Sequence, residues 1–252
     1  PFPLGDLMIA NLTSLRPAMV ELTQGAPAKP VLDVKFLSPV ANPTKIIGTP
    51  QNYELHAQEA TADHQISGGR ARRPMSEQGL FLKANSALVG PGEGVALRFP
   101  DRRTDHEAEL GVIIGKPCSN VSVEDALDNV AGYAIAMDMV VRGPEDRSFR
   151  KSVDTYAVLG PWVVTADELG DPGNLDFVLT VGGKVRQKAN TKDMVLDVPG
   201  QIAWASQFYT LHPGDIIMSG TCDGVERVQP GDVMHLEFER IGAMDVPVRA
   251  AG

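Results

Sequence analysis

Residues 105–115 read Asp-His-Glu-Ala-Glu-Leu-Gly-Val-Ile-Ile-Gly, and this alternation constrains the fold more than any other stretch of the chain. The even positions are apolar: Ala108, Leu110, Val112 and Ile114. The first odd positions are acidic: Asp105, Glu107 and Glu109. Alternation with a period of two predicts a β-strand with one apolar, buried face and one acidic face.

The acidic face brings two carboxylates together. Glu107 and Glu109 lie at positions i and i+2, so their side chains point the same way, roughly 7 Å apart along the strand. Carboxylates this close repel each other unless water screens them or a cation binds between them. The pair is therefore either a solvated strand face or half of a site for a hard cation such as Mg²⁺, Mn²⁺ or Ca²⁺.

A third acid, Asp138, interrupts the apolar run of residues 130–142. In a buried strand its charge needs a partner. Arg142 lies too far along an extended strand to contact Asp138. A bound metal is therefore favoured over the alternative, in which Asp138 is exposed at the end of the strand. Glu107, Glu109 and Asp138 are thus the candidate metal ligands. Asp105 shares the acidic face and His106 lies beside it, but we expect neither to be a ligand.

A second cluster lies in Asn-Tyr-Glu-Leu-His-Ala-Gln-Glu, residues 52–59. On one or two helical turns His56 and Glu59 share a face. A carboxylate beside a histidine fixes its tautomer and raises its basicity, which suits a general base for water. An ordinary surface pair is the alternative. Considered alone, Lys151 is consistent with an ordinary solvated lysine. Thr221, considered alone, is consistent with a plain turn after the strand predicted at 216–218.

Composition narrows the class of protein. The 252 residues suit one large domain or a domain with a small appendage. A net charge of −9 without a stripe of Lys and Arg argues against a nucleic-acid partner. Two cysteines without metal or disulfide spacing favour a reducing compartment, and we expect the cytoplasm. No apolar run is long enough to span a membrane and no secretory signal is visible. The sequence begins at Pro1 and not at Met, which leaves open whether residues precede it.

The organisation along the chain predicts a β-rich α+β protein. Residues 1–40 form a small N-terminal element leading into a strand at 31–37, and residues 41–252 form the main domain. Residues 45–47 predict a short buried strand. Polar residues 60–79, with Gly68-Gly69 and three arginines, form a candidate lid or binding loop.

Turn signals divide the rest of the domain. Three Pro-Gly-acid turns, at 91–93, 213–215 and 230–232, each precede a strand-like run. Residues 174–180 and the following Gly-Gly turn predict another pair of strands. Ser122 opens a capping box for a helix to about Asn129, and Asp197 caps a helix to about Phe208.

Together and in this order, these motifs resemble the fumarylacetoacetate hydrolase family, specifically its C-terminal catalytic domain, from about residue 45 to 248. The motifs that carry the resemblance are Lys45-Ile-Ile, Asn52-Tyr-x-x-His56-x-x-Glu59, Phe81-Leu-Lys83, Asp105-x-Glu107-x-Glu109-Leu, Gly132-Tyr-x-x-x-x-Asp138-x-x-x-Arg142, Lys151-x-x-Asp154, Leu159-Gly-Pro161, Gln187-x-x-Asn190-Thr191 and Leu211-x-Pro-Gly-Asp215-x-Ile-x-x-Gly220-Thr221. The resemblance implies a mixed β-sandwich roll with few short helices, usually a homodimer, that binds Mg²⁺ or Mn²⁺, with Ca²⁺ as a substitute.

The resemblance also implies roles for residues of this chain. Glu107, Glu109 and Asp138 match the metal carboxylates of the family. His56 and Glu59 match its water-activating pair, and Lys151 matches its electrostatic lysine. The implied substrate contacts are Thr221, Arg142, Gln187 and Tyr53. Arg142, or an arginine of residues 70–73, is expected to hold a second substrate carboxylate.

The implied activity is hydrolysis of a carbon–carbon bond in a β-diketo acid or acylpyruvate-like substrate, in the catabolism of aromatic compounds. The alternatives are an oxo-acid decarboxylase or keto–enol isomerase on the same scaffold, of the oxaloacetate decarboxylase or 2-hydroxyhepta-2,4-diene-1,7-dioate isomerase type, and a metal-binding member without catalytic activity. Three departures from the family pattern leave the substrate open: Gly48-Thr-Pro-Gln51, Gly143-Pro144 and Cys222-Asp223. The physiological metal and the role of residues 60–79 also stay open.

Overall fold

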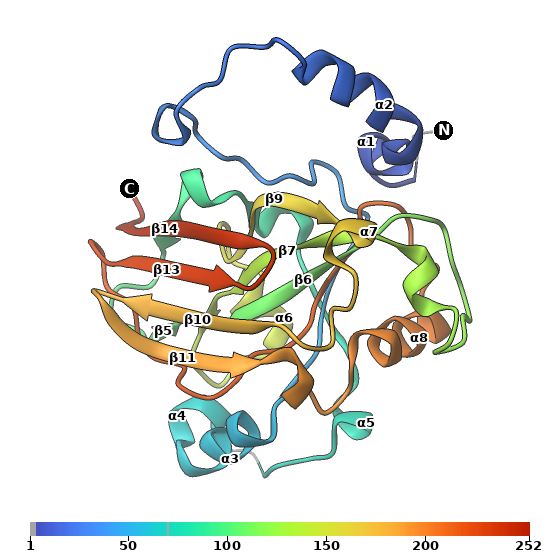
Figure 1. The fold of residues 1–252 in the computed structure, drawn as a ribbon. Helices are drawn as coiled ribbons and strands as arrows, with labels where there is room; N and C mark the ends of the chain where they lie inside the picture. Colours follow the sequence, from blue (N-terminus) through green and yellow to red (C-terminus); the bar gives the residue numbers. More distant parts are fainter. Residues whose placement is uncertain (1–3, 70) are drawn as a thin grey trace.

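The computed structural model describes residues 4–69 and 71–252, and it contains two large curled sheets that pack face to face (Figure 1). The larger sheet has seven strands, in the order β2 (Phe81–Lys83), β1 (Ile46–Gly48), β12 (Ile216–Met218), β6 (Ala108–Ile114), β7 (Val130–Asp138), β9 (Ala157–Thr165) and β3 (Leu88–Val89). The smaller sheet has five strands, in the order β11 (Lys184–Asn190), β10 (Asp176–Val181), β13 (Val233–Phe238), β14 (Gly242–Ala250) and β4 (Val95–Leu97). A short ribbon pairs β5 (Thr104–Asp105) with β8 (Val140–Val141).

The helices are mostly short and lie around the sheets (Figure 1). The α-helices are α1 (Leu7–Ala10), α2 (Leu12–Thr23), α3 (Glu54–Ala62), α4 (His64–Ser67), α5 (Met75–Gln78), α6 (Arg147–Lys151), α7 (Ala166–Leu169) and α8 (Val198–Phe208). Single 3₁₀ turns occur at η1 (Val31–Asp33), η2 (Asn85–Ala87), η3 (Pro91–Glu93), η4 (Ala126–Asn129) and η5 (Thr191–Asp193). Among the described residues, no helix has both the length and the apolar character needed to cross a membrane.

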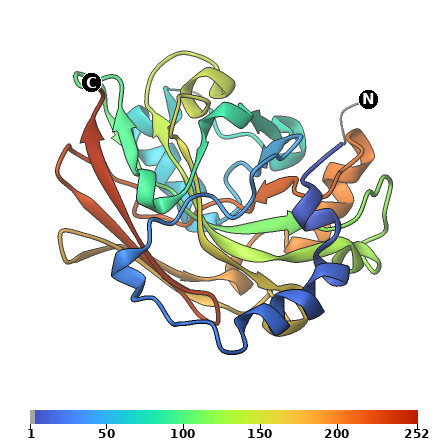
Figure 2. The same cartoon turned by 90° about the horizontal axis from the view of Figure 1, so that it is seen from above.

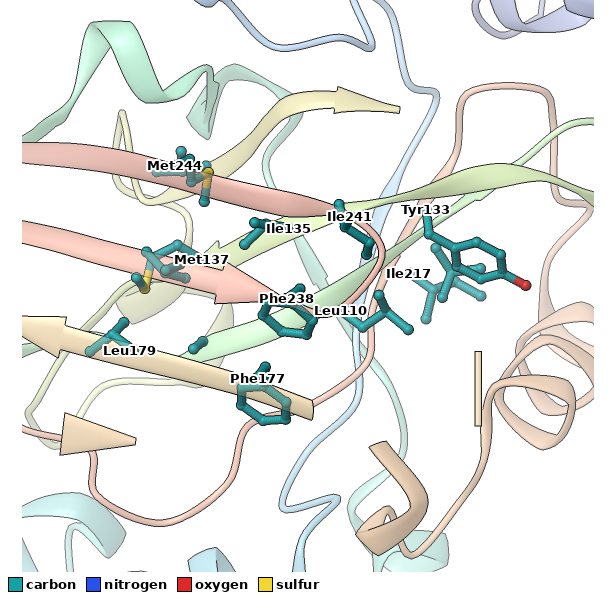
Figure 3. Packing of buried hydrophobic residues seen from close by; sticks show 14 of the residues in the cluster. Leu110, Tyr133, Ile135, Met137, Phe177, Leu179, Ile217, Phe238, Ile241 and Met244 are labelled. Carbon is teal, nitrogen blue, oxygen red and sulfur yellow. The ribbon is translucent and has the colours of Figure 1, made fainter. Parts of the chain in front are cut away.

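The main core fills the space between the two sheets (Figure 3). Leu110 of β6 and Ile135 of β7 are ladder partners, so they share the face that points at the smaller sheet. From the opposite side, Phe177 and Phe238 stack with their ring centroids 4.6 Å apart. The alternating residues of β6 and β7 therefore bury one face of the larger sheet, as the apolar even positions of β6 predict.

The other face of the larger sheet is buried as well. Ile113, Ala134 and Ala136 point away from the main core and form a second cluster. Ile9 and Val40 of the N-terminal segment are members of this cluster. Because both faces are covered, all seven residues of β6 are buried, including the acidic one.

Residues 4–37 form an arm that is anchored to the larger sheet at Ile9 and then leaves the body of the protein (Figure 1). Figure 2 shows the arm following the outer edge of the molecule. Helix α2 buries none of its residues, although Arg16 forms an ion pair of 2.6 Å with Asp167 of α7. The division at residue 40 into an N-terminal element and a main domain stays a prediction.

Several predicted elements are confirmed. The strand at 45–47 is β1, the 174–180 strand and its Gly-Gly turn form the β10–β11 hairpin, and Asp197 accepts a hydrogen bond from Gly200 N at the start of α8. Ser122 and Asp125 exchange capping hydrogen bonds, but the predicted helix is only a 3₁₀ turn because β7 already begins at Val130.

One prediction for the connecting segments is wrong. Residues 31–37 are not a strand: they form η1 and an irregular stretch, and no described strand pairs with them. Residues 60–79, predicted as a lid or binding loop, contain the end of α3 and all of α4 and α5. Arg70, which belongs to the basic run of this segment, lies outside the described residues.

Candidate active site

Three carboxylates converge where β6 begins and β7 ends. Asp138 N donates a hydrogen bond to Glu107 O at 2.9 Å, which fixes the register between the two strands beside the acids. Glu107, Glu109 and Asp138 each offer an oxygen within 4.8 Å of the other two. Their exposed fractions are 4%, 2% and 0%, so the alternative of a solvated acidic face is wrong.

Buried cations balance two of these acids. Lys151 Nζ donates to Glu107 Oε2 and Asp138 Oδ2, both at 2.5 Å. Arg142 Nη2 donates to Glu107 Oε1 at 3.1 Å. Burial alone would raise the pKa of Glu107, but Lys151 and Arg142 outweigh it and hold the pKa below its usual range. The pKa of Lys151 is raised for the same reason, since the surrounding carboxylates outweigh its burial.

Glu109 has much less compensation. Its Oε2 accepts a hydrogen bond from Gly220 N at 2.8 Å. Burial and the neighbouring Asp138 raise the pKa of Glu109 well above its ordinary value. Gly220 has a φ of +91°, and a Cβ on it would lie 2.5 Å from Asn52 Cβ, so this donor position requires glycine. The site therefore holds an acid whose charge is unfavourable until a cation is added.

This donor set fits a hard divalent cation. It offers carboxylate oxygens only, which Mg²⁺ and Mn²⁺ accept, and it lacks the sulfur and nitrogen donors that softer metals prefer. A cation at the three carboxylates would remove the repulsion that raises the pKa of Glu109. The residues present are thus suited to hold the metal that the sequence predicts.

His56, which is buried, and Glu59, which is half-buried, form a pair on α3 beside the carboxylates. Glu59 Oε2 lies 3.0 Å from His56 Nδ1, and Glu59 Oε1 accepts from Gly224 N at 2.9 Å. Gly224 has a φ of +91°, and a Cβ there would lie 2.0 Å from Arg186 O. Because Glu59 is held from both sides, the imidazole has a fixed orientation with Nδ1 toward Glu59. This arrangement suits a base that takes a proton at Nε2.

A cavity of about 610 Å³ joins these groups. Its lining includes the three carboxylates, His56, Lys151, Arg142 and Thr221, together with residues of α4, α5 and α6. The segment at 60–79, predicted as a lid or binding loop, supplies one wall through Ile66, Arg72 and Gln78. Residues more than 100 positions apart in the sequence therefore face one volume.

Two of the predicted substrate contacts do not line this cavity. Gln187 is buried, and its side chain bonds His106 Nδ1, Ala108 N and Thr221 Oγ1. Tyr53 is also buried, and its hydroxyl has no hydrogen-bond partner among the described residues. The geometry gives Gln187 a supporting function behind Thr221, and direct substrate contact by Gln187 or Tyr53 stays a prediction.

Arg142 lines the cavity, but internal acids already bind its guanidinium. Its Nε donates to Asp105 Oδ2 at 2.8 Å, and Nη2 donates to Glu107. Asp105 is buried and also accepts from Arg103 Nε at 2.7 Å. Asp105 thus anchors Arg142 beside Glu107. These contacts already occupy the guanidinium and do not favour its binding to a second substrate carboxylate, so that role stays a prediction.

Lys83 is a site residue that the sequence motif contained without revealing its role. Its Nζ is fully buried and contacts Asp138 Oδ1. Burial lowers the pKa of Lys83 although Asp138 acts to raise it. The sequence offered one signal for this position. Lys83 follows Phe81 by two residues in a short strand, so alternation places both side chains on one face. The sequence did not indicate that β2 and the end of β7 meet.

The chain matches known proteins along nearly its whole length. The family model for the fumarylacetoacetate (FAA) hydrolase C-terminal domain matches residues 45–249. A maleylpyruvate hydrolase of Aquipseudomonas alcaligenes is 53% identical over 252 residues, which is 99% of this chain and 88% of the relative. The crystal structure of maleylpyruvate hydrolase from Sphingobium sp. SYK-6, in complex with manganese(II) and pyruvate, is 43% identical with a TM-score of 0.84, covering 97% of this chain and 85% of that one.

Isomerases share the scaffold. The crystal structure of 2-hydroxyhepta-2,4-diene-1,7-dioate isomerase from Mycobacterium marinum is 33% identical with a TM-score of 0.74, and it covers 90% of this chain and 82% of that one. The fold and the acidic site define a metal-binding enzyme scaffold that acts on small oxo-acids. The chain belongs to the fumarylacetoacetate hydrolase family. The predicted family, the strand-rich fold and the class of enzyme, a hydrolase of ketonic substrates, are confirmed.

Proposed function

We propose that this chain hydrolyses the carbon–carbon bond of an acylpyruvate of the maleylpyruvate type, in the degradation of aromatic compounds. The observation that carries the proposal is that the three carboxylates, His56 and Lys151 line one cavity. The similarity to two maleylpyruvate hydrolases supports this substrate class. The metal-ligand role of Glu107, Glu109 and Asp138 is part of the proposal, with Mg²⁺ or Mn²⁺ as the ion.

The proposed reaction assigns each step to a group in the cavity. His56, oriented by Glu59, takes a proton from water at Nε2, and the water oxygen bonds to the distal carbonyl carbon of the acylpyruvate. The bond between that carbon and the adjacent methylene then breaks, and its electron pair stays on the pyruvate fragment as an enolate. When bound, the divalent cation polarises the 2-oxo group and stabilises negative charge on its oxygen.

Lys151 and Thr221 complete the site. Lys151 lies between Glu107 and Asp138, where its positive charge stabilises the enolate oxygen as charge develops. Thr221 Oγ1 donates to Ala108 O and accepts from Gln187 Nε2, which holds the hydroxyl at the cavity wall. We assign this hydroxyl to the substrate carboxylate, to which it would donate its hydrogen in place of Ala108 O. Return of the proton from His56 to the enolate carbon gives pyruvate, and maleylpyruvate would give maleate as the second product.

The experiment that tests the proposal uses chelator-treated protein reloaded with Mg²⁺ or Mn²⁺. We expect maleylpyruvate to be consumed with formation of one pyruvate per molecule, and we expect chelated protein to be inactive. His56→Ala should reduce hydrolysis by at least about a hundredfold, because general-base catalysis contributes about 10²–10⁴. His212→Ala, which changes a histidine outside the cavity, is the matched control. Full hydrolysis by the His56 variant would refute the assigned base.

A second candidate activity is keto–enol isomerisation or decarboxylation of an oxo-acid. The isomerase relative supports it, as does the fact that both activities need the carboxylates and Lys151 but no activated water. Wild-type protein that isomerises oxaloacetate but does not hydrolyse maleylpyruvate, with isomerisation retained in His56→Ala, would favour this second activity as the native one. Absence of every activity in metal-loaded protein would instead favour a non-catalytic member.

We also propose that the chain forms a homodimer through its N-terminal arm, residues 4–37, and that it works in the cytoplasm. Eleven of the twenty-one large apolar side chains that are exposed among the described residues lie in this arm. On α2, Leu12, Leu15, Met19 and Leu22 recur at helical spacing and form one apolar stripe. A stripe that the described residues leave largely exposed is typical of an interface.

Light scattering on the purified protein tests the assembly. We expect twice the mass of the chain, and we expect Leu15→Asp combined with Met19→Asp to give a monomer that keeps its circular dichroism spectrum. The matched control is Val185→Asp combined with Val233→Asp, which places the same charges on exposed apolar residues outside the arm. A monomeric wild-type protein would refute the proposal.

A further inference from the structure

The active-site cavity is lined by carboxylates at one end and mainly by arginines elsewhere. The three carboxylates lie next to His56 and to the buried cations that pair with them. Four arginines contribute to the rest of the lining, and they come from the segment before α5 and from α6: Arg72, Arg73, Arg147 and Arg150. Neither hydrolysis nor binding of the 2-oxo acid group requires arginines outside the carboxylate end of the cavity. These arginines therefore need another explanation.

A chain of contacts shows how far apart the two ends lie. The Phe81 ring contacts a cation from each end, with Lys151 Nζ 5.2 Å from its centroid and Arg147 Cζ 5.1 Å from it. These two cations are therefore at most about 10 Å apart. A six-bond carbon chain spans about 7 Å when extended. A small oxo-acid that binds at the carboxylate end can thus reach the arginine end.

Gln78 of α5 connects Arg147 to Arg73. Arg147 Nη2 donates to Gln78 Oε1 at 3.0 Å, and Gln78 Nε2 donates to Arg73 O at 2.9 Å and to Gln51 Oε1 at 2.7 Å. These bonds hold the backbone of Arg73 against α6 and against the turn that precedes α3. The position of Arg73 at the cavity wall is therefore built by hydrogen bonds from two separate elements.

The other cavity arginines have internal partners. Glu54 binds Arg72 through two hydrogen bonds of 2.9 and 2.6 Å. Arg142 is bound by Asp105 and Glu107. By contrast, within residues 4–69 and 71–252 no side chain is hydrogen-bonded or ion-paired to the Arg73 guanidinium, which is exposed to solvent and lines the cavity. A guanidinium in that state can bind a carboxylate in a bidentate manner without breaking an existing pair.

We propose that Arg73 binds a second carboxylate of the substrate, and that it makes the site selective for 2-oxo acids with a carboxylate at the far end of the chain. The inference rests on the proposed function for the orientation of the substrate, with its 2-oxo acid group at the triad. It gives residues 60–79 a role in specificity. Of the two alternatives that the sequence left open for the second carboxylate, Arg142 and an arginine of residues 70–73, it selects the second.

Two ligands of equal length test the inference without requiring turnover. 2-Oxoadipate and 2-oxohexanoate share the 2-oxo acid group and differ only in a terminal carboxylate or methyl group. We expect Mn²⁺-loaded wild-type protein to bind 2-oxoadipate at least tenfold more tightly by calorimetry. Arg73→Gln should remove this preference and change the affinity for 2-oxohexanoate less than twofold, and Arg73→Lys should keep part of it. Arg98→Gln changes an exposed arginine outside the cavity and is the matched control.

The outcomes that would contradict the inference differ from the outcome that would contradict the proposed function. A preference for 2-oxoadipate that survives in Arg73→Gln would overturn the role of Arg73, as would an equal loss of affinity for both ligands. Wild-type protein that shows the preference but cleaves no acylpyruvate would contradict the proposed function and leave the Arg73 site standing. With hydrolysis established, the same variant should lower kcat/KM for maleylpyruvate at least tenfold and leave acetylpyruvate within twofold.

Discussion

Glu109 and Glu107 lie two residues apart, yet neutralising each of them should change the stability of the metal-free protein in opposite directions. The carboxylate of Glu109 lies within 4.8 Å of two other carboxylates, with Gly220 N as its hydrogen-bond donor. Two unit charges 4.8 Å apart repel by about 3.5 kcal/mol at an effective dielectric constant of about 20. Lys151 offsets part of this repulsion. Glu109→Gln removes the charge and keeps an oxygen for Gly220, so we expect a gain of about 2 kcal/mol, or about 4–8 °C in Tm.

Glu107→Gln is the matched comparison on the same strand. Glu107 accepts hydrogen bonds from Lys151 at 2.5 Å and from Arg142 at 3.1 Å. Its pKa is lowered because these cations outweigh its burial. Hydrogen bonds to charged groups contribute about 1.5–3 kcal/mol, so we expect a loss of this size. The loss stays moderate because Lys151 keeps Asp138 and Arg142 keeps Asp105 as partners.

The pH dependence has a definite sign for each acid. The pKa of Glu109 is raised on folding, so its protonation favours the folded state at low pH, and this contribution is lost as pH rises through the raised pKa. The advantage of Glu109→Gln should therefore be largest near neutral pH and vanish below the ordinary glutamate pKa of about 4.3. The pKa of Glu107 is lowered, so its contribution is present above that ordinary value and is lost as pH falls through the lowered pKa.

Thermal unfolding with chelator and with Mg²⁺ or Mn²⁺ provides the assay. Wild-type protein should gain stability on addition of the metal, since an ion that binds only the folded state stabilises it. Neither variant should gain. The reasoning fails if metal-free Glu109→Gln is less stable than wild type, or if the two substitutions shift Tm in the same direction. Retained stabilisation by metal in both variants would refute the assigned ligands.

Three further substitutions test the supporting residues. Gly224→Ala should displace the donor to Glu59, because its Cβ would lie 2.0 Å from Arg186 O, and we expect at least a tenfold fall in hydrolysis, measured as a pH–rate profile. Lys83→Met removes a buried positive charge that contacts Asp138, so calorimetry should show Mn²⁺ binding at least fivefold more tightly; weaker binding would mean that Lys83 serves to orient Asp138. Asp105→Asn leaves Arg142 without a full partner in a buried position, so urea unfolding should show a loss of about 3 kcal/mol.

Local patterns predicted much of the site because its central residues lie on regular strands. Alternation fixed which side of β6 carries Glu107 and Glu109, and an acid inside an apolar run identified Asp138 as a buried charge that needs a partner. Both arguments depend only on neighbours in the sequence. The meeting of these three acids depends on the pairing of β6 with β7, which the family resemblance implied and the structure describes.

Other contacts were not predictable from local patterns. Lys83 and Asp138 are 55 positions apart, and no periodicity in either strand indicates that β2 and β7 meet at the site. The error at residues 31–37 has a related cause, because apolar residues in an extended run predict a strand only if another strand is available for pairing. Val31, Leu32, Val34 and Leu37 of this run are exposed, which fits the proposed contact with a second copy.

The charges of the site argue that metal and substrate depend on each other. Glu107, Glu109 and Asp138 face three buried cations, Lys83, Lys151 and Arg142, so the protein alone is close to neutral there. A divalent cation adds charge that these residues do not compensate, and burial makes uncompensated charge unfavourable. A 2-oxo acid supplies one negative charge through its carboxylate, and its enolate supplies a second. By this count the metal-loaded site returns to neutrality only when the substrate carboxylate and the enolate are both present, so its electrostatics favour the charge distribution of the reaction over that of the metal-loaded site without substrate.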